Sequence, residues 1–185
     1  MLMNAILENI YGRSSVRKYK REQIPDDDLK EILKAGSYAA SGRNRQPLRF
    51  TILQDKKVIR DFDERLKEIY AREAAPEFKA MLSDSDYSIF HNAPTLIFTF
   101  ASSDAVTPIE DGSLAVSNMM LAAHSMNYGT CFIGLAVPLD NFDDFRKICN
   151  ASDDLKYLSC ICLGIPDGTP EKHPKNDVKI LNWIR

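Results

Sequence analysis

The segment that most restricts the possible folds of this chain is an apolar helical stretch at residues 111–128. Its leucine, valine, methionine and alanine residues fall on nearly every side of the helix, and Gly129 follows as a candidate C-cap. A helix that is apolar all round is buried on all sides, because none of its faces is suited to water. We therefore expect it to lie at the centre of the fold or in an interface between subunits.

The rest of the chain alternates between patterns typical of strands and patterns typical of helices. Residues 94–101 and 157–165 are rich in β-branched, aromatic and other apolar side chains, which predicts two buried strands. The other predicted elements are helices at residues 4–11, 25–40, 58–69 and 142–148 and a short strand at 50–53. An apolar helix between two core strands favours an α+β or α/β layered fold.

Two stretches lack a clear pattern. Residues 72–92 are polar and only weakly periodic, and we expect them to form a mobile excursion over the body rather than part of the core. Residues 166–185 are expected to form an extended C-terminal tail. Because domains average about 150 residues, a chain of 185 residues argues for one domain over residues 1–185.

The charge and hydropathy of the chain exclude several classes of protein. It has 24 basic and 26 acidic residues, so the basic excess typical of nucleic-acid-binding proteins is absent. Its apolar stretches are shorter than the ~20 residues that span a bilayer, and residues 1–10 lack the basic flank of a signal peptide. We expect a cytoplasmic protein that binds neither nucleic acid nor a membrane.

The cysteines, histidines and glycines do not form a known catalytic or metal-binding motif. Cys160 and Cys162 alternate along a predicted strand, so both point to one face as buried reduced thiols. The sequence has no C-x-x-C pair, and His91, His124 and His173 lack metal-binding spacing, so no metal site is predicted. The G-x-G-x-x-G and P-loop motifs are also absent, so a nucleotide would have to be bound by another route.

Residues 13–21, here called the first window, form the most informative part of the sequence. They read R-S-S-V-R-K-Y-K-R, with five cationic residues and no acid in a chain whose net charge is −2. Guanidinium groups and nearby hydroxyls are the donors that a phosphate monoester requires. The alternative is that these cations only complement the negative end of the preceding helix.

Two further windows contain groups suited to a planar ligand. The second window, residues 39–47, contains Asn44 and Gln46, whose amides can pair with the edge of a heterocycle such as a flavin pyrimidine. The third window, residues 128–134, contains Gly134, where a backbone N–H could approach a planar ligand unobstructed. Taken singly, the second window is better explained as an ordinary polar loop and the third as a helix-to-strand connection.

Four motifs occur in a fixed order along the chain. They are R-S-S-V-R-K-Y at residues 13–19, S-G-R-N-R-Q-P at 41–47, D-G-S-L-A-V-S-N-M-M-L-A-A-H-S-M-N-Y-G-T-C-F-I-G at 111–134, and L-G-I-P-D at 163–167 before a basic tail. Together they resemble the nitroreductase family, which comprises FMN-dependent NAD(P)H oxidoreductases. The resemblance covers essentially the whole chain, least clearly at residues 72–92. It implies an α+β fold, a three-layer α/β/α sandwich with a mostly antiparallel sheet, and an intimate homodimer with FMN at its interface.

The resemblance also implies a set of FMN ligands. The first window would bind the phosphate, the ribityl chain and the pyrimidine edge, and the second window would reach the flavin from the partner subunit. The third window would approach the flavin ring, and the tail would return a cation to the phosphate. The implied ligands are Arg13, Ser14, Ser15, Arg17, Ser41, Asn44, Gln46, Ile133, Gly134 and Lys175, with Lys172 as the alternative to Lys175.

The reaction implied by the resemblance is a ping-pong hydride transfer. NADH or NADPH would reduce FMN, and a nitroaromatic, a quinone or a similar conjugated acceptor would then be reduced at the same site. Because the flavin carries this chemistry, no side chain is assigned a catalytic role. The alternatives are another flavin reaction on the same fold, such as enoate reduction, dehalogenation or flavin breakdown, and a non-catalytic FMN-binding module. Ala40, Leu48 and Lys175 depart from residues common in the family, which leaves substrate shape and cofactor affinity open.

Overall fold

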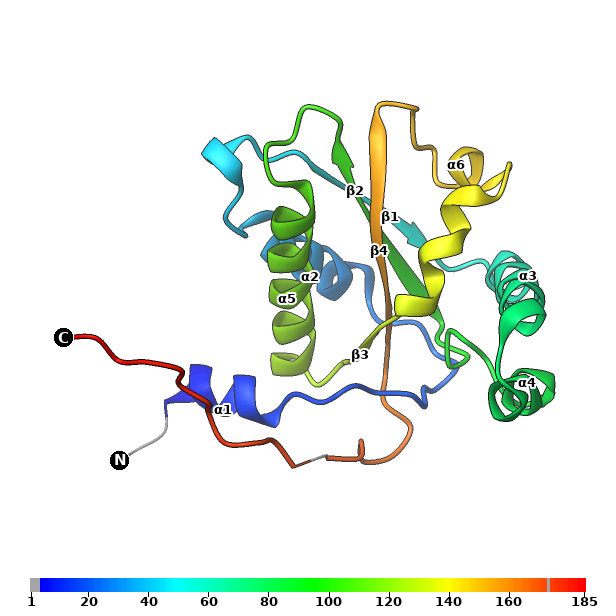
Figure 1. Ribbon diagram of the computed structural model, residues 1–185, viewed down its shortest axis with the longest axis horizontal. Coiled ribbons are helices and arrows are strands. Elements are labelled where there is room, and N and C mark those ends of the chain that lie inside the picture. The colour runs from blue at the N-terminus through cyan, green and yellow to red at the C-terminus, as the bar shows by residue number, and fades with distance from the viewer. Residues whose placement is uncertain (1–3, 173) are drawn as a thin grey trace.

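The computed structural model describes residues 4–172 and 174–185, which form helices on both sides of a sheet (Figure 1). The elements, with η for a 3-10 helix, are α1 (Ala5–Gly12), α2 (Asp26–Ser37), η1 (Gly42–Asn44), β1 (Leu48–Leu53), α3 (Lys56–Glu73), α4 (Pro76–Ser83), β2 (Thr95–Ser102), α5 (Pro108–Ser125), β3 (Gly129–Phe132), η2 (Gly134–Asn141), α6 (Phe145–Ile148) and β4 (Leu155–Gly164). After β4 the chain continues as an extended tail, as predicted.

Within the described residues, four strands form an antiparallel sheet in the order β1-β2-β4-β3. Residues 95–101 of the central strand β2 are all buried, because helices cover both faces of the sheet. In β4, Cys160 and Cys162 both point into the same core, and the four cysteines of the chain are free and buried. The predicted core strands and the reduced, buried thiols are therefore confirmed.

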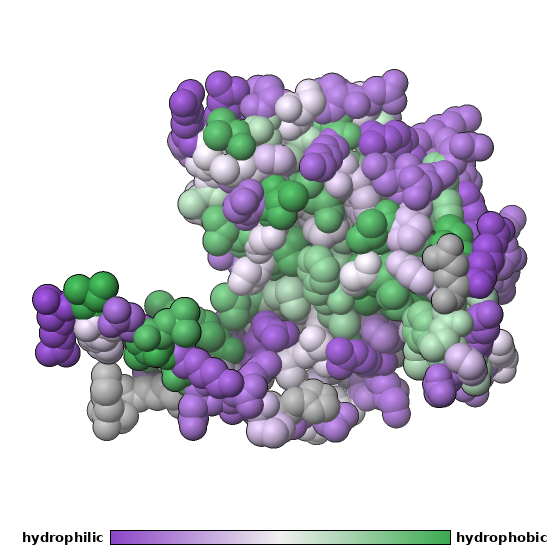
Figure 2. All heavy atoms as spheres, in the orientation of Figure 1, coloured by the Kyte–Doolittle hydropathy of each residue, from purple (hydrophilic) through white to green (hydrophobic). Residues whose placement is uncertain are grey.

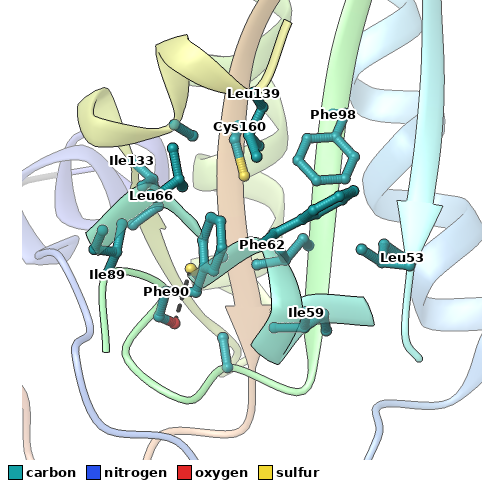
Figure 3. Close-up of a cluster of buried hydrophobic side chains, with 14 of the residues drawn as sticks. Leu53, Ile59, Phe62, Leu66, Ile89, Phe90, Phe98, Ile133, Leu139 and Cys160 are labelled. Atoms are coloured by element: carbon teal, nitrogen blue, oxygen red, sulfur yellow. Dashed lines mark hydrogen bonds between the residues drawn. The ribbon is translucent and has the colours of Figure 1, made fainter. Parts of the chain in front are cut away.

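Helices α3 and α6, together with η2, cover one face of the sheet. Phe98 of β2 packs against Phe62 of α3 and Phe145 of α6, with ring centroids 6.5 Å and 5.3 Å apart. Figure 3 shows Phe62 and Leu66 of α3 pointing toward Phe98 and Cys160 of the sheet. This aromatic cluster is the larger of the two parts of the core.

Helices α2 and α5 cover the opposite face of the sheet. Ile32 of α2 and Met119 of α5 are fully buried against Ile97 and Ile161. A Cβ at Gly36 would lie only 2.7 Å from Met119 Cγ, so the glycine lets the two helices approach closely. The expected α+β sandwich of helices, antiparallel sheet and helices is thus confirmed, while the homodimer stays a prediction.

Helix α5 is covered on one side only within the chain. Ala115, Met119 and Ala123 face the sheet and are fully buried, whereas Ile109 and Leu114 are 61% and 49% exposed. The prediction that this helix is buried on all sides is therefore wrong for a single chain. Its outer face stays available for the other possibility, a subunit interface.

The predicted end of this helix is also wrong. The helix stops at Ser125, and Asn127, with φ of +64°, adopts the left-handed conformation that was expected of a C-cap glycine. Gly129 instead begins β3, where a Cβ would lie 2.7 Å from the side chain of Val16. The glycine is thus required by the close approach of the first window to β3.

The segment at residues 72–92 is better ordered than its sequence pattern predicts. It contains α4, and its residues Ile89 and Phe90 are buried in the core. The buried carboxylate of Asp63 accepts hydrogen bonds from Phe90 N (3.2 Å) and Ser88 Oγ (2.9 Å). The expectation that this segment lies outside the core is therefore wrong, because a few residues at its end suffice to anchor it.

Candidate functional site

The first window lies along the end of the sheet as an extended segment. Val16 N donates to Thr130 O (2.9 Å), and Lys20 N donates to Ile165 O (2.9 Å). The side chains of Val16 and Tyr19 are buried, so they fix the segment against β3 and the end of β4. The side chains between and before these anchors are thereby held in defined positions.

A cavity of about 380 Å³ lies beside the start of this window, and we call it the Arg13 cavity. Its lining residues are Gly12, Arg13, Ser14, Val16, His124, Asn127, Tyr128, Thr130, Pro166, Gly168, Thr169, Pro170 and Lys172. Three of them are basic, and no aspartate or glutamate is among these described lining residues. Cationic side chains alongside hydroxyl and amide donors make this a cavity suited to an anion.

The guanidinium of Arg13 is incompletely paired in this cavity. Its Nη1 atom is buried and has no hydrogen-bond partner among the described residues. A buried charged donor without an acceptor is costly, and an acceptor bound in the cavity would reduce this cost. A phosphate group, with several anionic oxygens, fits this donor set.

Arg17 and Ser15 lie farther along the first window, outside the lining of the cavity. Arg17 is exposed, and Ser15 pairs through its backbone with Thr130 of β3. Burial raises the pKa of the Cys131 thiol. The opposing effects of Arg17, Ser15 and Arg13 offset this rise only in part. Cys131 is therefore a neutral thiol under the window and not an activated nucleophile.

The end of the 72–92 segment reaches the same region. Burial lowers the pKa of His91, and the positive charge of Arg17 lowers it further, against the opposing effect of Asp63. His91 is thus within electrostatic reach of Arg17. No local sequence pattern indicates this proximity, because the two residues are separated by seventy-odd positions.

The second window lies elsewhere in the chain and lines a second cavity of about 590 Å³, here called the Ser41 cavity. Ser41, Asn44 and Gln46 all line it, and none of them lines the Arg13 cavity. Gln46 N donates to Ser41 Oγ (3.0 Å), so the window is folded on itself. The three expected ligands of this window are therefore together, but apart from those of the first window.

Helix α5 separates the two cavities. Gly42 N donates to Asp111 Oδ1 (3.0 Å) in the first turn of α5, whereas His124 of the Arg13 cavity lies in its last turn. These two positions on α5 are about 20 Å apart, at 1.5 Å per residue. Figure 1 shows η1 and the first window at opposite ends of this helix.

The third window and the tail differ in part from expectation. Ile133 N already donates to Cys160 O (2.9 Å), whereas a Cβ at Gly134 would meet no atom within 4 Å, so the space above Gly134 is open. In the tail, Lys172 lines the Arg13 cavity, and Lys175 is exposed and outside its lining. The geometry therefore favours the second choice, Lys172, as the tail cation.

His124, Asn127 and Thr130 are among the lining residues of the Arg13 cavity that were not predicted as site residues. His124 was considered only as a metal ligand, and its position near the end of an apolar helix was the one available signal. Among the described residues, no group of histidine, cysteine and acidic side chains is arranged to hold a metal. In that same part of the chain, no helix combines the length and apolarity needed to cross a membrane.

Comparison with known proteins places this chain in a family. A sequence profile of the nitroreductase family matches residues 10–165. The chain is 30% identical over 173 residues to iodotyrosine deiodinase from Thermotoga neapolitana, covering 90% of this chain and 91% of that protein. It is 26% identical over 174 residues to NADPH-flavin oxidoreductase from Vibrio harveyi, covering 94% and 70%. The crystal structure of a nitroreductase with bound FMN from Bacteroides fragilis matches with a TM-score of 0.84 and 28% identity, over 99% of this chain and 100% of that one. The chain therefore belongs to the nitroreductase family, a family of NAD(P)H-dependent flavin oxidoreductases.

Proposed function

We propose that this protein binds FMN and uses NADH or NADPH to reduce a nitroaromatic, a quinone or a similar conjugated acceptor. The observation that carries the proposal is the buried, unpaired Nη1 of Arg13 in a cavity that contains two more basic side chains. The relatives support the same cofactor, since a similar nitroreductase structure contains FMN.

The residues of the Arg13 cavity fit the phosphate end of FMN. Arg13 and Lys172 would supply positive charge, and Ser14 and Thr130 would supply hydroxyl donors. Arg17, exposed farther along the window, would lie toward the ring, where a cation favours the anionic reduced flavin. When bound, FMN supplies the hydride chemistry itself. The neutral thiol of Cys131 takes no part in it, so we still assign no catalytic side chain.

Turnover with a quinone tests this function. Protein reconstituted with FMN should oxidise NADH or NADPH in the presence of menadione with a kcat of about 1 s⁻¹ or more, a typical enzymatic value. Loss of absorbance of the reduced nicotinamide measures the rate, and free FMN without protein is the control. A protein that retains FMN but is reduced by neither nicotinamide would instead be a binding module, which contradicts the proposal.

Reductive deiodination is a second candidate, favoured by the 30% identity to iodotyrosine deiodinase. In that reaction two electrons and one proton convert a carbon–iodine bond into a carbon–hydrogen bond and release iodide. The FMN-loaded protein, kept reduced by dithionite, would then release iodide from 3-iodo-L-tyrosine, measured by ion chromatography. Iodide release without quinone turnover would favour this activity over the first.

We also propose that two copies of the chain share each flavin. The first and second windows line separate cavities, next to two positions of α5 that are about 20 Å apart along the helix. A second copy would bring the second window of one chain to the first window of the other. Apolar side chains on α1, on the outer face of α5 and on the tail are exposed, and Figure 2 shows several of them on a projecting arm. The exposed set is Ile6, Ile10, Tyr11, Ile109, Leu114, Val178, Ile180, Leu181, Trp183 and Ile184. A second copy would cover this surface.

Complementation between two defective variants tests the shared site. Arg13→Ala and Asn44→Ala should each weaken FMN binding at both sites of their homodimers. A mixed dimer of the two would contain one site with both native residues and one site with neither. Co-expressed and separated by different affinity tags, it should therefore bind about one FMN per dimer with native affinity. Sedimentation should give about twice the 20.9 kDa of the chain. A mixed dimer without a tight site, or a monomer that binds FMN tightly, would contradict sharing.

A further inference from the structure

His124 is the basic residue of the Arg13 cavity to which neither the sequence motifs nor the family resemblance gives a role. It lies in the last turn of α5, and its side chain is partly buried. A Cβ at Gly12 would lie 3.0 Å from His124 Nε2, so the imidazole sits directly over the glycine at the end of α1. The absence of a side chain at Gly12 thus leaves room for the ring at the cavity wall.

Among the described residues that line the cavity with His124, the titratable groups are basic or neutral. Arg13 approaches from the first window and Lys172 from the tail, and both line the same cavity. The remaining titratable group of the lining, Tyr128, donates its hydroxyl hydrogen bond to Asp28 of α2. Within the described residues, the imidazole of His124 has no hydrogen-bond partner, so its ring nitrogens are available to a ligand.

We propose that His124 is a third basic ligand of the FMN phosphate and that it takes up a proton when the phosphate binds. This proposal rests on the proposed function. The affinity for FMN would then fall as the pH rises, through the loss of this proton. Riboflavin, which has the same ring and no phosphate, would not show this contribution.

The electrostatics of the cavity give the direction of the effect. Burial lowers the pKa of His124, and the charges of Arg13 and Lys172 lower it further, so the imidazole is neutral at pH 7 without an anion. A phosphate with a charge of about −2 beside it reverses the sign of the local field and raises this pKa. Binding therefore takes up a proton at pH values between the pKa of the free protein and that of the complex. Above both values, the contribution of His124 disappears.

The phosphate group of FMN also titrates, so it makes its own contribution to the pH dependence of FMN affinity. Its second pKa is about 6, so below that pH it loses part of its charge and binds more weakly to any cationic site. This change occurs in wild type and variants alike. The contribution of His124 is therefore read from the difference between the wild type and His124→Gln, whose side chain is uncharged at every pH.

The experiment is a titration of flavin fluorescence quenching at about pH 6.5 and about pH 8.5. For His124→Gln, we expect the Kd for FMN to exceed that of the wild type by about tenfold at the lower pH, the value of one charge-assisted hydrogen bond, and to equal it at the higher pH. His124→Lys should keep tight binding at both pH values, and riboflavin affinity should be the same in all three proteins. The histidine signal that His124→Gln removes from the NMR spectrum should titrate at higher pH with FMN than with riboflavin.

The outcomes separate this proposal from the proposed function. If FMN binds tightly and Arg13→Ala weakens it, but wild type and His124→Gln have parallel pH profiles, only the role of His124 is wrong. If His124→Gln weakens FMN and riboflavin equally, the imidazole is a packing group over Gly12 and the proposal is also wrong. If the wild type binds FMN no better than riboflavin, the phosphate site itself is wrong, and both proposals fail together.

Discussion

Replacement of Phe145 by alanine should lower the free energy of unfolding by about 3–5 kcal/mol, as is typical for a fully buried phenylalanine. Phe145 of α6 is completely buried and lies at the centre of the aromatic cluster. Its ring centroid is 5.1 Å from that of Tyr157, 5.3 Å from Phe98, 5.8 Å from Phe62 and 6.0 Å from Phe100. These four rings belong to three elements, α3, β2 and β4. They cannot all move inward, so a cavity would remain.

Urea unfolding, followed by far-ultraviolet circular dichroism at one fixed protein concentration and without added FMN, measures this loss. Phe132→Ala is the matched control, because Phe132 on β3 is 50% exposed. It should cost far less, since surface positions usually change stability by about 0.5 kcal/mol or less. Equal losses in the two variants would show that the aromatic cluster does not hold the helices to the sheet.

Replacement of Arg13 by alanine should raise the Kd for FMN by about tenfold or more. Charge-assisted hydrogen bonds contribute about 1.5–3 kcal/mol each, and the guanidinium of Arg13 has a buried donor that no other residue in the described part of the chain satisfies. The affinity for riboflavin should change little, because riboflavin lacks the phosphate. Quenching of flavin fluorescence measures both constants.

Arg21→Ala is the control for this experiment. Arg21 belongs to the same cationic window, but it is exposed and lies outside the lining of the Arg13 cavity. Its removal changes the net charge of the protein by the same amount as Arg13→Ala, and so it reports only long-range electrostatics. If both variants lose FMN affinity equally, the phosphate is not bound by Arg13 in particular.

The local pattern was sufficient to predict the two core strands and to single out the first window. β2 and β4 could be predicted because a strand buried on both faces needs apolar residues throughout. Such a strand is visible in the sequence as a run of consecutive apolar residues. The first window was informative for a similar reason. Five cations without an acid are a local feature, and Arg13 and Ser14 indeed line a cavity suited to an anion.

The anchoring of residues 72–92 could not be predicted in the same way. Ile89 and Phe90 are adjacent residues near the end of a mostly polar segment, and two neighbouring residues produce no periodic signal. In their buried position, the backbone N–H of Phe90 donates a hydrogen bond to Asp63 of α3 inside the core. Such a long-range partner is invisible to a pattern that compares only neighbouring residues.

The same limit applies to the site. The sequence could not show that the residues of the Arg13 cavity lie together, because His124 and Lys172 are more than a hundred positions away from Arg13. The tail returns to the first window through the pairing of Tyr19 with Pro166, and that pairing selects Lys172 over Lys175. The exposure of the outer face of α5 likewise depends on packing, because the sheet covers only one side of this apolar helix. Side-chain periodicity determines which residues avoid water, whereas the three-dimensional packing of distant segments determines which of them meet.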